Sequence, residues 1–165
     1  MFLWNKNMEN FDKTDLSILS CLQQDASLSN VELAAKIGLS PSPTLARVKH
    51  LETEGVIAHY VALVDPHALG LKVNVFVRVS LEKQESGALE RFEKAVSHFE
   101  EVMEVYLMTG DEDYLLRIVV PDIQALEYFI LEHLTKIPGI KNIKSSFALK
   151  QVKYKTALPI AHHLR

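Results

Sequence analysis

Residues 29–55 read SNVELAAKIGLSPSPTLARVKHLETEG, and this stretch decides the fold of the N-terminal part. Ser29 begins an S-x-x-E pattern typical of a capping box, in which two side chains accept backbone N–H groups at the start of a helix. Gly38 ends that helix, because glycine readily takes the left-handed conformation of a helix terminus. A further helix is predicted to start near Ser42, with Pro43 in its first turn, where a missing N–H does no harm.

Apolar residues at helical spacing complete this part of the chain. An earlier helix is predicted from Lys13 to Gln24 by leucines that recur at every third position. The residues expected to face inward on the three helices are Leu16, Leu19 and Leu22, then Leu33, Ala34 and Ile37, then Leu45, Val48 and Leu51. Three compact helices joined by short turns predict a helix-turn-helix domain over residues 11–56.

The third helix of a helix-turn-helix lies in the DNA major groove, and its N-terminal residues reach base edges. Hydroxyl groups and a helix N-terminus suit phosphate oxygens, whereas an arginine can reach phosphate or guanine. The candidate DNA-binding residues are Asn30, Ser40, Ser42, Thr44, Arg47, Lys49 and His50. The alternative is a small helical domain whose third helix is only solvated, because helix-turn-helix geometry also occurs in structural roles.

A different periodicity follows this helical part. Residues 57–70 are β-branched and aromatic up to an Asp-Pro pair, which predicts a connecting strand and linker. Val73–Leu81 then alternates apolar and polar residues, as a half-buried strand does. The remaining pattern is helix–strand, then strand–helix–strand. Residues 71–155 are therefore expected to form a ferredoxin-like βαββαβ domain, giving an α+β fold, with residues 1–10 as an N-terminal extension and 156–165 as a C-terminal tail.

One face of the predicted sheet is unusually apolar. In a ferredoxin-like domain both helices cover the same face, so the other face is polar in a monomer. Here that face is expected to include Phe76, Tyr106, Met108, Leu115 and Val119. So much apolar surface favours burial against another subunit.

The turn at residues 110–114, Gly-Asp-Glu-Asp-Tyr, has two interpretations. Aspartate and glycine suit the backbone angles of turns, so it can be simply a turn. Alternatively, exposed N–H groups could bind a carboxylate and an aspartate an ammonium group. The acids lack the spacing of a calcium loop, and the sequence indicates neither a metal site nor a catalytic constellation.

The amino-acid composition excludes several other classes of protein. The 165 residues are 48% hydrophobic and 24% charged, which excludes a disordered or collagen-like chain. No apolar run is long enough for a membrane helix, and a single cysteine, Cys21, suits the reducing cytoplasm. Residues 1–65 hold 5 basic and 8 acidic side chains, so the whole net charge of -3 lies in the proposed DNA-binding half. Because phosphate contacts are then few, we expect several such domains to bind together in an oligomer.

These motifs, in this order, resemble the leucine-responsive (Lrp/AsnC) transcription regulators. The resemblance is carried by FDKTD at 11–15, NVELA at 30–34, GLSPSP at 38–43, RVKHLE at 47–52 and TGDEDYLL at 109–116. It spans roughly residues 11–155. A helix-turn-helix alone would be weak evidence, but the ordered set is specific.

The resemblance implies an amino-acid-responsive DNA-binding regulator, not an enzyme, with no cofactor other than the amino-acid effector. Leucine or methionine is the effector expected from the most similar subgroup. Family members form dimers through their sheets, and the dimers often assemble into octamers. By position, the effector pocket should include Thr109, Gly110, Asp111, Asp113 and Tyr114, with Ser145 and Ser146 on the last strand. Two alternatives remain: a haem-pathway decarboxylase of the same architecture, or an amino-acid sensor that acts through protein partners.

Overall fold

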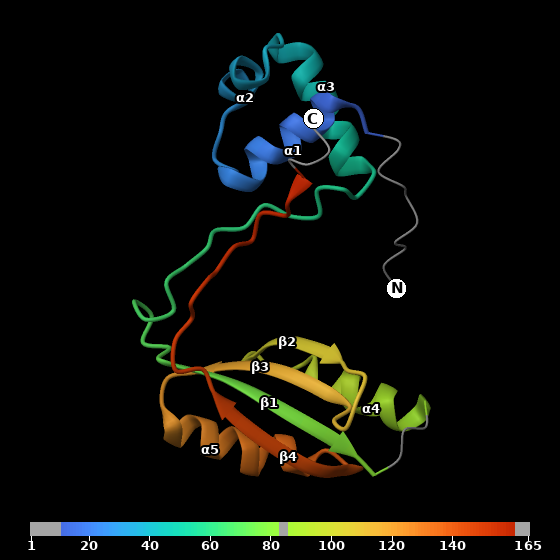
Figure 1. Ribbon diagram of the computed structural model, residues 1–165, viewed down its shortest axis with the longest axis vertical. Coiled ribbons are helices and arrows are strands. Elements are labelled where there is room, and N and C mark those ends of the chain that lie inside the picture. The colour runs from blue at the N-terminus through green and yellow to red at the C-terminus, as the bar shows by residue number, and fades with distance from the viewer. Residues whose placement is uncertain (1–10, 83–85, 161–165) are drawn as a thin grey trace. The chain divides into compact units, whose positions relative to one another are not determined.

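The computed structural model describes residues 11–82 and 86–160 and divides into two compact units. A helical unit takes the chain up to Leu63 together with the segment from Lys153 onward, and a sheet unit comprises Val64–Val152 (Figure 1). The predicted extension at residues 1–10 lies outside the described residues. None of the helices in the described ranges is long and apolar enough to cross a membrane.

The helical unit contains the three predicted helices: α1 (Lys13–Gln24), α2 (Asn30–Ile37) and α3 (Pro41–Thr53). Capping boxes start α1 and α2, and Gly38 ends α2 with φ of 71°. Proline at the first position of α3 leaves no backbone donor unsatisfied there. The helix-turn-helix prediction is thus confirmed, with α3 beginning one residue before the expected start.

A small apolar core holds these helices together. Ile18, Leu33 and Leu51, one from each helix, are buried against one another, with partly buried residues around them. The expected inner face of α3 was wrong at one position, because Leu45 is 43% exposed and Thr44 is fully buried instead. Thr44 donates its hydroxyl proton to the carbonyl oxygen of Ser40 at 2.9 Å, so its burial leaves no unsatisfied hydroxyl.

The sheet unit has the predicted βαββαβ order. Its elements are β1 (Val73–Leu81), α4 (Ser86–Val96), β2 (Val102–Leu107), β3 (Tyr114–Val120), α5 (Ile123–Glu132), the 3-10 turn η2 (Leu134–Lys136) and β4 (Ile140–Phe147). The antiparallel sheet has the order β2-β3-β1-β4, so the two central strands are β1 and β3. The ferredoxin-like prediction is confirmed.

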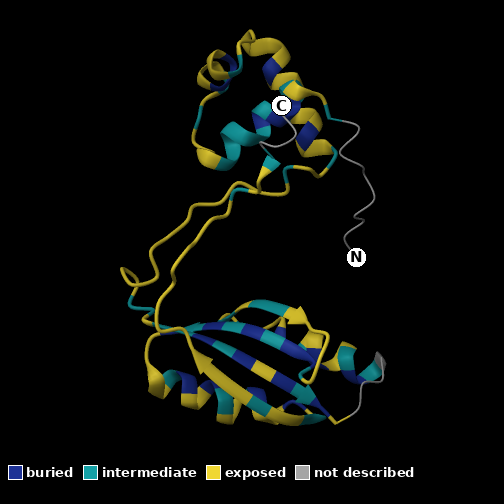
Figure 2. Ribbon diagram, viewed as in Figure 1, coloured by how far each residue is buried: buried dark blue, intermediate teal, exposed yellow. Residues whose placement is uncertain are grey.

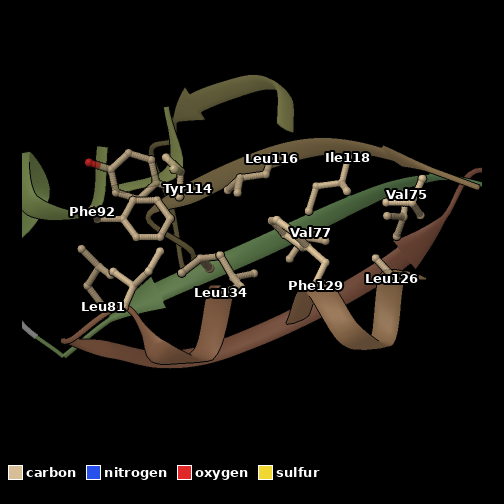
Figure 3. Close-up of a cluster of buried hydrophobic side chains, with 14 residues drawn as sticks. Val75, Val77, Leu81, Phe92, Tyr114, Leu116, Ile118, Leu126, Phe129 and Leu134 are labelled. Atoms are coloured by element: carbon tan, nitrogen blue, oxygen red, sulfur yellow. The ribbon is translucent and has the colours of Figure 1, made fainter. Parts of the chain in front are cut away.

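Both long helices pack against the same face of this sheet. Alternate residues of β1 and β3 point toward them, and Val77, Leu116 and Ile118 are fully buried there. Phe92 of α4 and Phe129 of α5 close the core from the helix side (Figure 3). The alternation of buried and more exposed residues along the central strands is visible in Figure 2.

Strand alternation places the remaining side chains on the opposite face, where none of the described helices packs. Phe76, Leu115 and Val119 lie there, as the apolar pattern predicts, and Tyr106 pairs opposite Leu115. Polar residues of this face include Arg117, whose Nε donates to Oε1 of Glu104 at 2.7 Å.

One predicted element is absent: residues 57–64 form no strand. No described strand pairs with this segment, and apolar β-branched residues alone do not make a ladder. The last strand ends at Phe147. Residues 153–160 are grouped with the helical unit, whereas residues 153–155 were expected in the sheet domain. There the N–H of Leu158 donates to Oε1 of Gln23 in α1 at 2.6 Å.

Candidate DNA-contacting and effector-binding surfaces

The solvent-facing side of α3 carries a narrow polar face. At 3.6 residues per turn, Ser42, Ala46, Lys49 and Thr53 share the side opposite the buried Thr44 and Leu51. All four are exposed. We call these four residues the outer face of α3. It brings together two of the predicted DNA-binding residues, Ser42 and Lys49, while the exposed His50 lies at its edge.

The N-terminus of α3 adds few donors beside this face, because Pro41 and Pro43 have no N–H and that of Thr44 donates to the carbonyl oxygen of Ser40 at 3.4 Å. Ser40 occupies the cap position, is exposed and makes no side-chain capping bond. Its hydroxyl and the N–H of Ser42 are suited to a phosphate oxygen. Asn30 was predicted to contact DNA, but its Nδ2 donates to the carbonyl oxygen of Pro41 at 2.8 Å. That bond fixes the start of α2 to the start of α3.

Arg47 points away from the outer face, toward α1. Its Nη1 lies 2.8 Å from Oδ2 of Asp12 and 2.8 Å from Oδ1 of Asp15. Hydrogen bonds to Asp15 and then to Asp12 raise the pKa of the guanidinium, so the charge is firmly held. The structure therefore brings Arg47 to two carboxylates, and it places Thr44 in the core, where no DNA contact is available.

The effector candidates surround the turn between β2 and β3. A hollow of about 120 Å³ opens here, and we call it the turn hollow. Its lining residues are Arg78, Met108, Thr109, Glu112, Tyr114 and Leu115. Thr109 and Tyr114 were predicted, whereas Arg78 and Glu112 were not. The β1–β3 register shows why Arg78 was missed, since it pairs opposite Leu115, 37 residues later in the sequence.

Charged side chains meet beside the turn hollow. Oε1 of Glu112 lies 3.2 Å from Nζ of Lys144 and 3.8 Å from Nη1 of Arg78. Arg78 also donates from Nη2 to the hydroxyl of Ser146 at 3.3 Å. Two cations thus share one carboxylate beside the hollow. The bond to Arg78 brings Ser146 next to this charged group.

Asp113 is turned into the domain instead of toward a ligand. Its Oδ2 accepts the N–H of Leu81 at 2.7 Å, and its own N–H donates to the carbonyl oxygen of Val79 at 2.9 Å. The side chain is 7% exposed. In this chain the buried carboxylate joins the turn to the end of β1, and its place in the effector pocket stays a prediction.

Tyr114 borders the hollow but directs its ring into the core. Its ring centroid lies 4.5 Å from that of Phe92, and its hydroxyl donates to Oε1 of Glu93 at 2.8 Å. Burial, together with Glu93, raises the pKa of this phenol well above its usual range. A neutral, fixed tyrosine here forms a wall of the hollow and takes no part in proton transfer.

The other candidates divide between the turn and β4. Gly110 and Asp111 are exposed in the turn, and Gly110 has φ of 130°, which favours glycine. Ser145 pairs opposite Val77 and so lies on the helix-covered side of β4, unlike Ser146. The two neighbouring serines therefore cannot serve the same hollow.

Both units match known families of domain. Residues 11–58 match a winged helix-turn-helix DNA-binding model, and residues 74–158 match the Lrp/AsnC ligand binding domain model. This combination defines a class of DNA-binding regulators that respond to small molecules. The chain belongs to the Lrp/AsnC family of transcriptional regulators, which confirms the sequence-based assignment.

Individual relatives agree with this assignment. The chain is 47% identical to the Bkd operon transcriptional regulator of Pseudomonas aeruginosa, over 93% of this chain and 100% of that protein. It is 40% identical to the leucine-responsive regulatory protein of Escherichia coli, over 92% of this chain and 93% of that protein. A transcriptional regulator of Neisseria meningitidis, solved as an L-Met complex, is 40% identical with a TM-score of 0.88, over 93% and 99%.

These relatives are regulators and not enzymes, so a decarboxylase of the same architecture is not favoured. The protein is thus a sequence-specific DNA-binding transcriptional regulator with an amino-acid-binding domain.

Proposed function

We propose that the turn hollow binds a free amino acid with an unbranched or γ-branched apolar side chain, methionine or leucine, and that binding changes how copies of the chain assemble on DNA. The observation that carries the proposal is the pairing of charged and apolar walls. Met108 and Leu115 offer apolar surface. Charges of both signs lie beside them, since Arg78 and Lys144 are each within 4 Å of Glu112.

These charges complement a zwitterion. An α-carboxylate would be attracted to Arg78 and Lys144, whose combined charge exceeds that of Glu112. An α-ammonium group would be attracted to Glu112 in turn. Arginine suits a carboxylate especially well, because its planar fork donates two parallel hydrogen bonds. The relative from Neisseria meningitidis was solved with L-Met, which supports the same ligand class.

The hollow of one chain is too small to enclose such a ligand. Its 120 Å³ falls below the roughly 300 Å³ at which ligand pockets begin. A second copy is therefore needed to complete the site, which couples ligand binding to assembly: a ligand that fits only the assembled form shifts the population toward that form.

The open sheet face supports a paired state. Phe76, Leu115 and Val119 present apolar surface there, and among the described residues Oδ1 of Asn74 is buried on that face without a hydrogen-bond partner. A buried amide oxygen normally finds a donor, and a second sheet packed on this face could supply one. We propose a dimer through these faces, with octamers built from dimers through the ligand sites.

Calorimetric titration of the full chain with methionine, leucine, asparagine and lysine tests the ligand class, and light scattering on the same samples tests the assembly. We expect methionine or leucine to bind and to shift the particle mass. The Arg78→Gln variant should bind at least about tenfold more weakly, equivalent to the loss of roughly 1.4 kcal/mol.

Arg91→Gln is the matched control, since Arg91 is an exposed arginine on α4 of the same unit and lies outside the hollow. It should bind as tightly as the unsubstituted chain. Failure of all four amino acids to bind, or equal loss in both arginine variants, would contradict the proposed site.

A further inference from the structure

The N-terminus of α1 is closed by an unusual set of side chains. Asp12 caps the helix and Asp15 occupies the third helical position, so the capping box contains two carboxylates. Oδ1 of Asp12 accepts the N–H of Asp15 at 2.8 Å, and Oδ2 of Asp15 accepts the N–H of Asp12 at 3.2 Å. Two like charges are thereby held side by side, an arrangement that is unfavourable on its own.

Arg47 of α3 binds the two carboxylate oxygens that accept no backbone N–H in the capping box. Its Nη1 reaches Oδ2 of Asp12 and Oδ1 of Asp15, each at 2.8 Å. All four carboxylate oxygens are then used, two by backbone N–H groups and two by one guanidinium nitrogen. The cation neutralises the repulsion and joins a residue 32 positions later in the chain to the start of α1.

The capping box of α2 provides an internal comparison. Ser29 and Glu32 form the same reciprocal bonds with a single carboxylate, and Glu32 is exposed. Backbone and hydroxyl donors from Ser29 lower the pKa of Glu32 without an arginine. An arginine is therefore not a general requirement of a capping box; it is required where the box contains two acids and one of them, Asp15, is buried.

We propose that Arg47 is a positioning residue: it fixes the orientation of the DNA-contacting helix α3 against α1 by neutralising the Asp12–Asp15 capping box, and it does not itself contact DNA. The role goes beyond the established DNA-binding function, because it assigns recognition to the outer face of α3. Lys49 is then the basic side chain of that face, since the only other cation between Leu39 and Leu51 is occupied within the domain.

The location of Arg47 on α3 agrees with this role. It lies one position before the partly buried Val48 and three after the buried Thr44, on the flank that packs toward α1. Lys49 lies on the far side, with Ser42 and Ala46. To reach a phosphate, Arg47 would have to leave two charge-assisted hydrogen bonds, which are among the stronger polar contacts.

The experiment compares Arg47→Met, Arg47→Met combined with Asp15→Asn, and Lys49→Met in the full chain. Asparagine at position 15 can accept the same N–H and donate to Asp12, so the double variant has a capping box with one acid. DNA affinity is measured at several salt concentrations with a duplex enriched from a random library by the unsubstituted protein. Hydrogen exchange of residues 13–24 reports the order of α1.

We expect Arg47→Met to increase exchange in α1 and to weaken DNA binding about tenfold. In the double variant, the exchange rates of α1 and the DNA affinity should both return to within about threefold of their values in the unsubstituted chain. The slope of log affinity against log salt should be unchanged in both variants, because no phosphate contact is lost. Lys49→Met should leave exchange unchanged and reduce that slope by about one.

A double variant that regains slow exchange in α1 but not DNA affinity, with a slope reduced by about one, would overturn the proposal and make Arg47 a DNA contact. So would tighter DNA binding by Asp15→Asn alone with a steeper slope, because an arginine freed from its acid would then be engaging phosphate. If Arg47→Met fails to fold, Arg47→Lys is used instead: it keeps the neutralising charge, so exchange in α1 and DNA affinity should stay within about threefold of the unsubstituted chain, and a tenfold loss of affinity with unchanged exchange would contradict the proposal.

Discussion

The helical unit and the sheet unit are held together in different ways. In the sheet unit a cluster of 14 buried apolar residues joins the two central strands, the two long helices and the segment after α5, and partly buried residues of β2 and β4 pack against it (Figure 3). In the helical unit the corresponding cluster has three fully buried members, Ile18, Leu33 and Leu51. Polar interactions between helices supplement this small core. Arg47 forms ion pairs with the start of α1, and Asn30 donates a hydrogen bond to Pro41.

This difference in core size indicates which interactions fix the relative positions of the helices and strands in each unit. A large apolar core is non-directional and tolerates small shifts, whereas a hydrogen bond fixes distance and angle. A DNA-binding helix needs a defined orientation more than it needs stability. The helical unit therefore depends on individual polar side chains whose residue types are typical of a protein surface. Substitution of one such side chain should change the geometry of the helical unit more than a polar substitution changes that of the sheet unit.

The largest effect is expected from Phe129→Ala in the sheet core. The ring is buried and packs edge-on against Phe99 with centroids 5.3 Å apart. Its removal should lower the free energy of unfolding of the sheet unit by about 3–5 kcal/mol. Chemical denaturation followed by tyrosine fluorescence measures it, and Tyr128→Ala, 62% exposed on the same helix, is the control. A similar small loss in both variants would contradict the assigned core.

A somewhat smaller effect is expected from Leu51→Ala in the helical unit. Leu51 is fully buried, so the substitution should cost about 2–5 kcal/mol, toward the lower end if the small core collapses into the space. Because the units are separately packed, fast hydrogen exchange should appear in α1, α2 and α3 and leave β1 and β3 protected. Equal loss of protection in the sheet would show that the two units unfold as one.

An intermediate effect is expected at the capping box of α2. Ser29→Ala removes the side-chain oxygen that accepts the N–H of Glu32 at 3.3 Å and should destabilise the helical unit by about 1 kcal/mol. Ser42→Ala, on the outer face of α3, should change stability by less than about 0.5 kcal/mol. Denaturation midpoints of both variants provide the measurement, and an equal loss in the two would remove the distinction between capping and exposed serines.

The smallest effect is expected from pH. The N–H of Asp15, followed by Arg47, lowers the pKa of Asp12 below its ordinary value of 3.8, although partial burial opposes the shift. A carboxyl whose pKa is lower in the folded state contributes stability above its unfolded pKa and loses it as the pH falls through the folded pKa. The protection factors of the α1 amides, which correct for the slower intrinsic exchange in acid, should therefore fall below about pH 4. In Asp12→Ser that acid-dependent fall should be smaller, and an identical pH profile of the protection factors would contradict the role of this carboxyl.

Local signals in the sequence were sufficient for most of the fold. The helix limits at Lys13, Gln24 and Gly38 follow from caps and periodicity within a few residues of one another, and the structure reproduces them. Errors arose where a partner segment decides the outcome. Residues 57–64 are rich in strand-forming residues, but no described strand pairs with them, so they form no ladder.

Candidate site residues were harder to predict for the same reason. Arg47 has the type and position of a DNA contact, but Asp15, 32 residues earlier, determines where its side chain points. Thr44 is turned into the core, where its hydroxyl bonds the carbonyl oxygen of Ser40. Asp113 matches a ligand motif, yet the N–H that it binds belongs to Leu81, on the neighbouring strand. Arg78 was missed because only the strand register brings it beside the turn. A local stretch of sequence shows which residue types are present, but it does not show which group a polar side chain will bond in the folded chain.

The return of the chain to the helical unit has a further consequence. Residues 64–152 form the whole sheet unit, and the segment from Lys153 belongs to the helical unit, where Leu158 is bonded to Gln23 of α1. Residues 153–158 match the ligand binding domain model and are nonetheless grouped with the helical unit. Truncation of the chain after residue 152 would therefore leave the whole sheet unit in place and remove a segment that is bonded to α1. Such a truncation should lower the stability of the helical unit more than that of the sheet unit.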